Sequence, residues 1–124
     1  MTDPEDPELL APHLRVEMEV PEAGVRVIAL RGELDVATVP AFRDVLDPLA
    51  EDETVELLCV DLVEVTFIDS TGLMALLNAL RRMARRQARL VIACSNPTVL
   101  RLFEATRTDA TFEIVATREQ ALAG

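Results

Sequence analysis

Residues 65–77 read VTFIDSTGLMALL, an apolar run that is interrupted once, at the small or polar residues 69–72. Such a break either caps a helix or lies where a partner can reach it, and the two interpretations are compatible. Asp69 or Ser70 is a suitable N-cap, an interaction worth about 1 kcal/mol. A hydroxyl at a helix N-terminus, on the carboxyl edge of a parallel sheet, also stands where open sheets bind ligands. Ser70 is therefore a candidate site of modification.

The sequence on either side of this break predicts a strand and a helix. Residues 55–62 form a nearly continuous apolar run, typical of a strand covered on both faces. After the break, apolar residues recur at helical spacing, at Leu73, Leu76, Leu77, Leu80 and Met83. This helix ends among arginines, whose charge suits the carbonyl end of the helix dipole.

The preceding residues predict a hairpin and a helix. Residues 14–20 alternate apolar and charged side chains, residues 21–24 suit a turn, and residues 25–30 form a second strand, which together indicate an antiparallel hairpin. Thr38 is an N-cap candidate for a helix with Pro40 in its first turn. Pro48 is expected to end or kink that helix.

The remaining residues continue the alternation of strands and helices. Residues 90–94 predict a buried strand, and Asn96 with Pro97 opens a helix over residues 98–105. Residues 111–115 predict a last strand, and Thr117 with Gln120 forms a capping box for a helix over residues 118–123. We therefore expect a single α/β domain with a mostly parallel mixed sheet, an N-terminal antiparallel hairpin and about four helices.

Composition narrows the classes of function. The chain has 124 residues, half of them apolar, with 22 acidic and 12 basic residues and a net charge of -10. That charge disfavours nucleic acid and anionic membrane surfaces and favours a protein or small-molecule partner. No apolar stretch reaches the roughly 18 residues of a membrane span, and the N-terminus lacks signal-peptide features. We expect a cytoplasmic protein with a mobile acidic tail over residues 1–12 and one domain over residues 13–124.

Several kinds of chemistry are disfavoured. Cys59 and Cys94 lie in apolar runs and are expected to be reduced core residues. His13 is the only histidine, which argues against a histidine-dependent triad and a multi-histidine metal site. Residues 69–72 match an aspartic protease signature only in part, and the nucleophile elbow and phosphate-binding glycine loops are absent from the sequence. We expect no enzymatic activity, cofactor or metal. The arginines between residues 81 and 89 are expected to form a solvated face.

Asp35 has two open interpretations. It either ends the second strand and begins the turn into the next helix, or it is a functional carboxylate on the same edge of the sheet as Ser70.

Taken together, the motifs resemble the STAS domain of bacterial anti-sigma factor antagonists. The resemblance covers about residues 14–122 and is carried by residues 32–35 (GELD), 60–62 (VDL), 67–73 (FIDSTGL), 96–97 (NP) and 101–103 (RLF). The segment DSTGL after a buried strand is the most specific of these. Residues 106–109 depart from the family pattern, since members often carry a glycine there.

The resemblance implies a phosphorylation switch. In that family, an ATP-dependent anti-sigma factor kinase phosphorylates the serine after the aspartate, which corresponds to Ser70. The unphosphorylated protein binds the anti-sigma factor and frees the sigma factor, and a metal-dependent serine/threonine phosphatase resets the switch. The partner-binding residues then map onto Asp35, Asp69, Ser70, Thr71 and Gly72. We expect a monomer or weak dimer.

Two other functions are compatible with the sequence. A STAS module can act as a ligand sensor or a scaffold in a signalling assembly, without control of a sigma factor. A small hydrolase using Ser70 is the alternative from another class of protein.

Overall fold

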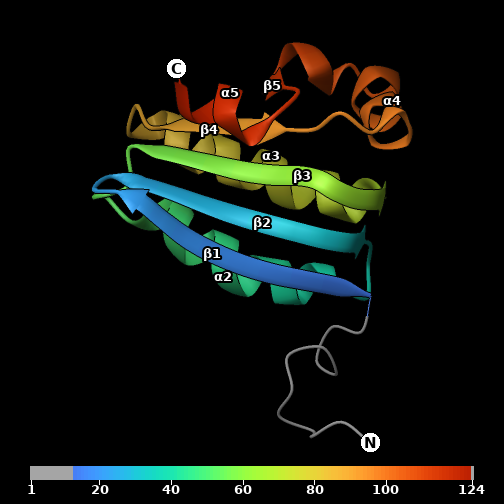
Figure 1. The fold of residues 1–124 in the computed structure, drawn as a ribbon, viewed down its shortest axis with the longest axis horizontal. Coiled ribbons are helices and arrows are strands. Elements are labelled where there is room, and N and C mark those ends of the chain that lie inside the picture. Colours follow the sequence, from blue (N-terminus) through green and yellow to red (C-terminus); the bar gives the residue numbers. More distant parts are fainter. Residues whose placement is uncertain (1–12, 124) are drawn as a thin grey trace, which may run out of the picture.

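Five strands form a single mixed sheet in the computed structural model, which describes residues 13–123 (Figure 1). The order across the sheet follows the order along the chain. The strands are β1 (Leu14–Glu22), β2 (Val25–Leu34), β3 (Leu57–Ile68), β4 (Arg89–Ala93) and β5 (Glu113–Val115). β1 is antiparallel to β2, and every later neighbour pair is parallel. The predicted hairpin and parallel sheet are thus confirmed, whereas the predicted tail over residues 1–12 lies outside the described residues.

The helices form unequal layers on the two faces of the sheet. They are α2 (Val39–Glu51), α3 (Ser70–Arg85), α4 (Pro97–Ala105) and α5 (Arg118–Ala123), with a 3₁₀ turn, η1 (Thr108–Ala110). α2 and α3 lie behind the sheet in Figure 1 and share the main core with α4. On the opposite face, Ala121 of α5 packs in a small cluster with Val27, Cys59, Val91 and Ala93. None of the helices in residues 13–123 is long and apolar enough to cross a membrane.

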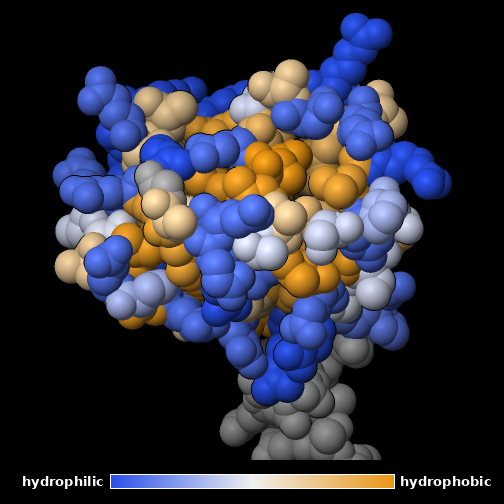
Figure 2. Space-filling view, turned by 45° about the horizontal axis from the view of Figure 1, so that its top comes forward, coloured by the Kyte–Doolittle hydropathy of each residue, from blue (hydrophilic) through white to orange (hydrophobic). Residues whose placement is uncertain are grey.

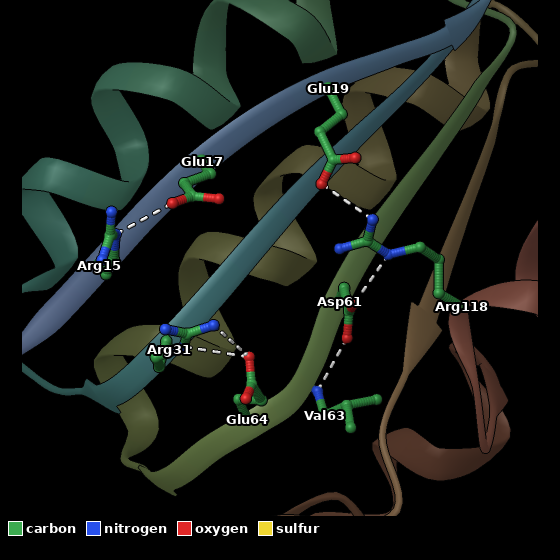
Figure 3. Close-up of polar contacts among 8 residues, drawn as sticks. All are labelled: Arg15, Glu17, Glu19, Arg31, Asp61, Val63, Glu64 and Arg118. Carbon is green, nitrogen blue, oxygen red and sulfur yellow. Dashed lines mark hydrogen bonds and ion pairs between the residues drawn. The ribbon is translucent and has the colours of Figure 1, made fainter.

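Charged side chains occupy the part of the sheet that α5 leaves open (Figure 3). Arg118 bridges Asp61 of β3 at 2.9 Å and Glu19 of β1 at 2.8 Å, which attaches α5 to two strands. Arg31 pairs with Glu64 at 3.0 Å between β2 and β3. Apolar surface remains visible between charged groups on the face shown in Figure 2. This face of the sheet is therefore mixed in character, unlike the face under α2 and α3, which contributes the main core.

Several predicted boundaries are wrong. The largest shift is in β3, which runs to Ile68 instead of ending at residue 62, and β5 begins at Glu113 instead of residue 111. The second strand was expected to end at residue 30, but β2 continues to Leu34 because its last residues pair with the extended end of β3. α2 does not end at Pro48 and runs to Glu51. A proline in the last turn removes only one helical hydrogen bond, and Arg86 donates to the carbonyls of Leu49 and Ala50 at this end of the helix.

The caps predicted for the C-terminal half are confirmed. The amide of Thr98 donates to Asn96 Oδ1 at 2.9 Å at the start of α4. Thr117 and Gln120 form the reciprocal capping box before α5, with both bonds at 3.2 Å. Both cysteines are buried and free, as expected.

The loop that departs from the family pattern keeps the backbone conformation that glycine favours. Arg107 has φ 61°, in the left-handed region, just after the end of α4. The chain therefore makes the turn without glycine, in a conformation that costs a non-glycine residue about 1 kcal/mol or more. The unpredicted η1 follows directly.

Gly32 of β2 lies opposite Leu14 at the start of β1. Its φ is +116°, and a Cβ atom there would collide with the carbonyl oxygen of His13. That oxygen accepts the amide hydrogen of Glu33 at 2.7 Å, so it cannot move without loss of a hydrogen bond. Gly24, in the hairpin turn, also has a positive φ of +79°, but its nearest neighbour would be the flexible Glu56 side chain at 3.3 Å.

Replacing these glycines by alanine separates backbone strain from collision. We expect Gly32→Ala to lower the free energy of unfolding by about 2 kcal/mol or more, and Gly24→Ala by only about 1 kcal/mol. Urea denaturation of both variants measures the difference. Equal losses would show that the His13 carbonyl does not confine Gly32.

Candidate functional site

Two loops meet at the carboxyl edge of the sheet. β2 and β3 are parallel neighbours whose last residues, Leu34 and Ile68, are paired in register. Asp35 and Asp69 follow these residues directly, so Asp35 and Ser70 lie at the same edge of the sheet. The amide of Asp69 donates to the carbonyl of Leu34 at 3.1 Å and ties the two loops together.

The carboxylate of Asp69 organises both loops. Its Oδ1 accepts the amide hydrogens of Thr71 at 2.9 Å and Gly72 at 3.3 Å, which caps the N-terminus of α3. Its Oδ2 accepts the amide hydrogen of Val36, in the β2–α2 loop, at 3.2 Å. Of the two predicted N-caps, Asp69 therefore takes the role, and Ser70 becomes the first residue of the helix.

These hydrogen bonds set the charge state of Asp69. Partial burial alone would raise the pKa of its carboxyl group, but hydrogen bonds from Thr71, Gly72 and Val36 outweigh burial and hold the pKa below its ordinary value of 3.8. Asp69 is consequently a stable anion at neutral pH and a weak base. A serine nucleophile needs an adjacent base to remove its proton, and Asp69 is poorly suited to that role.

Asp35 shapes the neighbouring loop. Its Oδ1 accepts the amide hydrogens of Ala37 at 3.0 Å and Thr38 at 3.1 Å. Thr38 occupies the predicted N-cap position of α2 but makes no side-chain cap bond. Its buried hydroxyl donates instead to the carbonyl of Glu33 at 2.8 Å and accepts from the amide of Asp35 at 2.9 Å. The observed contacts of Asp35 are therefore those of a turn-forming residue.

The residues after Asp69 differ sharply in accessibility. Ser70 is exposed, and its hydroxyl makes no hydrogen bond to residues 13–123. Thr71 is half-buried and donates its hydroxyl hydrogen to Asp69. Gly72 is buried, and a Cβ atom there would lie 2.8 Å from Leu34 Cγ. Glycine thus lets the first turn of α3 pack tightly on β2, while the Ser70 hydroxyl faces outward.

A groove between α2 and α3 begins at Ser70. It encloses about 770 Å³ and is lined by Val36, Val39, Pro40, Arg43, Asp44, Asp47, Ser70, Thr71, Met74, Ala75, Asn78 and Arg81. Two of its apolar side chains are unusually accessible, with 70% of Val36 and 55% of Met74 exposed. Apolar groups exposed beside a polar rim are typical of a protein-binding surface.

Neither residue was predicted from the sequence. Met74 carried a usable signal, because it is apolar yet lies outside the leucine stripe of α3 and one turn after Ser70. Val36 carried none, since a single apolar residue in a loop is ordinary in a sequence.

The chain is similar to the members of a known protein family. The STAS domain model matches residues 16–121. An anti-sigma-B factor antagonist of Listeria monocytogenes is 34% identical over 87 residues, which is 70% of this chain and 75% of that protein. One of Staphylococcus aureus is 37% identical over 79 residues, 64% of this chain and 72% of that protein.

A solved structure agrees with the fold over nearly the whole chain. The crystal structure of an anti-sigma factor antagonist from Mycobacterium paratuberculosis superimposes with a TM-score of 0.81 at 26% identity. The match covers 89% of this chain and 92% of that one.

The capping role of Asp69 predicts a stability difference between adjacent positions. Asp69→Ala is expected to lower the free energy of unfolding at pH 7 by about 1–2 kcal/mol, because three amides lose their acceptor. Ser70→Ala, as the matched control, is expected to stay within about 0.5 kcal/mol of the wild type, since Ser70 is exposed. Chemical denaturation of both variants measures this.

The same pair has a defined pH dependence. A carboxyl group whose pKa is lower in the folded state contributes its full stabilisation above its unfolded pKa and loses it as the pH falls through the folded pKa. The gap between wild type and Asp69→Ala should therefore be complete above about pH 4 and narrow below it, while the Ser70→Ala gap stays flat. A constant gap for Asp69→Ala would contradict the assigned role of the ionised carboxylate.

Proposed function

This chain belongs to the STAS domain family, and we propose that it acts there as an anti-sigma factor antagonist. In this proposal, the form with unphosphorylated Ser70 binds an anti-sigma factor that is also a serine kinase, and so releases the sigma factor. Phosphorylation of Ser70 by that kinase ends binding, and a serine/threonine phosphatase restores it. The chain is then a regulatory binding protein rather than an enzyme.

One observation carries the proposal. Ser70 presents an exposed, unbonded hydroxyl at the start of α3, at the mouth of a groove with exposed apolar side chains. Relatives more than 30% identical are named anti-sigma-B factor antagonists, which supports the same class of partner for this chain.

Ser70 is a better phosphate acceptor than Thr71. A kinase must place the attacking hydroxyl in line with the transferred phosphoryl group. The Ser70 hydroxyl is free to do so, whereas that of Thr71 is half-buried and bonded to Asp69. We therefore assign Thr71 a supporting role in the partner-binding surface.

The other predicted partner-binding residues act mainly by position. Asp69 and Gly72 fix the start of α3 through capping and close packing. Asp35 shapes the loop that presents Val36. In the proposal, the partner covers this edge together with the groove between α2 and α3.

Phosphorylation is not expected to unfold the free protein. The phosphate adds about -1.5 to -2 charges. The N-terminus of α3 favours an anion by roughly 0.3 to 2 kcal/mol, and repulsion from the ionised Asp69 offsets part of this gain. Since the side chain points to solvent, the folded state tolerates the change.

The same phosphate acts differently in a complex. Docking would desolvate it against a surface shaped for a hydroxyl, and a buried unpaired charge typically costs about 3 to 5 kcal/mol. At about 1.4 kcal/mol for each factor of ten, affinity falls by roughly two to three and a half decades. This loss exceeds any local stabilisation, so the switch requires no large conformational change.

Substitutions at Ser70 test the switch. We expect Ser70→Ala to bind the cognate anti-sigma factor as the wild type does, and Ser70→Asp to bind poorly, in a pulldown or by calorimetry. Incubation with the kinase and ATP, followed by mass mapping, should place the phosphate on Ser70 of the wild type. Thr71→Val, as the control, should still be phosphorylated. Equal binding of Ser70→Ala and Ser70→Asp would remove Ser70 as the switch.

A second substitution tests the docking surface. Met74→Glu places a charge on the apolar part of the groove and should weaken anti-sigma factor binding about tenfold or more, because desolvated apolar anchors dominate interfaces. Val63→Glu changes a similarly accessible side chain, 40% exposed on β3, and should leave affinity unchanged. If both variants bind alike, the groove is not the docking surface.

A further inference from the structure

We propose that two copies of this chain pair along the outer edge of β1, in an antiparallel ladder centred on Val16 that joins their sheets. This surface is distinct from the proposed switch, because β2 separates β1 from the strand that leads into Ser70. Both functions can therefore be tested separately.

Within residues 13–123, β1 is an edge strand whose outward backbone groups can bond to a further strand. β1 is the first strand of the sheet, and within residues 13–123 no strand pairs with its outer side. The carbonyl of His13 accepts the amide hydrogen of Glu33 at 2.7 Å, one position beyond the Leu14–Gly32 pair of the β1–β2 register. Because bonded residues alternate in an antiparallel pair, the amides and carbonyls of Leu14, Val16 and Met18 point away from β2.

Between Leu14 and Glu19 this edge has neither a proline nor a bulge, because Pro21 and the register shift of β1 lie further along the strand. The β1–β2 register is regular from Leu14 to Glu19, without a bulge. Met18 and Val20 are 48% and 55% exposed, respectively. Long, regular edge strands with exposed apolar residues are templates for another strand.

The charged residues of β1 favour a second copy of β1 as the pairing strand and determine the register of the pair. With Val16 of both copies on the twofold axis, Leu14 lies opposite Met18 of the second copy. Arg15 lies opposite Glu17 of the second copy, and the symmetry repeats each pair. Opposite charges in facing positions stabilise antiparallel strands. Moving the axis to Glu17 would place that carboxylate opposite itself, which is repulsive.

The participating side chains are accessible. Arg15 and Glu17 lie on the open face of the sheet, as Figure 3 shows, with 53% and 55% of their side chains exposed. In the single chain they pair with each other at 3.0 Å, and in the dimer the same groups can pair between copies. A self-complementary strand of this kind fits a second copy of the chain better than an unrelated partner.

Charge reversal on the full chain tests the pairing and its register. Sedimentation analysis should show the wild type in a monomer–dimer equilibrium. Arg15→Glu and Glu17→Arg should each raise the dimer dissociation constant about tenfold or more, because two attractive pairs become repulsive. An equimolar mixture of the two variants should form a heterodimer, and the double variant Arg15→Glu/Glu17→Arg should regain dimerisation.

Two controls distinguish a loss of dimerisation from a loss of folding. Circular dichroism should show each variant folded, since an exposed ion pair contributes at most about 1 kcal/mol. If either is unfolded, Met18→Pro, which removes an outward amide without touching the β1–β2 ladder, should abolish the dimer. A wild type that stays monomeric at every concentration, or a dimer indifferent to these changes, would overturn the proposal. Binding of Ser70→Ala to the anti-sigma factor would still test the switch independently.

Discussion

The hydrogen bonds of the Asp69 carboxylate are the interaction on which the site depends. One oxygen caps α3 through the amides of Thr71 and Gly72, and the other holds the amide of Val36 in the adjacent loop. Because Asp69 caps α3, the helix does not depend on a hydrogen bond from the side chain of Ser70. Ser70 can therefore expose its hydroxyl without weakening the fold.

This division of roles explains how one edge of the sheet can be both rigid and modifiable. Asp69 and Gly72 are committed to capping and packing, and Asp35 to its turn. Under the proposed switch, a phosphate on Ser70 changes the charge of the surface rather than the position of the backbone. Regulation then comes from the change in surface charge, which alters partner binding, while the backbone keeps the conformation of the unmodified protein.

Much of the fold could be predicted because its signals are local. The leucine spacing of α3, the cap at Asn96 and the box at Thr117 depend on residues a few positions apart, and each is present in the structure. The errors arise where residues distant in the sequence determine the end of a helix or strand. α2 continues past Pro48 to an end capped by Arg86, the residue that follows α3, and the length of β2 is set by pairing with β3.

The site shows the same limit. The motif identified Asp69 and Ser70 together, but the sequence did not distinguish the cap from the exposed hydroxyl. Nor could it show that Met74 and Val36 meet at one groove, since α3 and the β2–α2 loop come together only through the parallel pairing of β2 and β3.

The most direct test is to measure stability and binding on one stoichiometrically phosphorylated sample. The account predicts that the free energy of unfolding stays within about 1 kcal/mol of the unmodified protein, while affinity for the anti-sigma factor falls about a hundredfold or more. A loss of stability large enough to explain the loss of binding would contradict it, because the phosphate would then act by disrupting the scaffold.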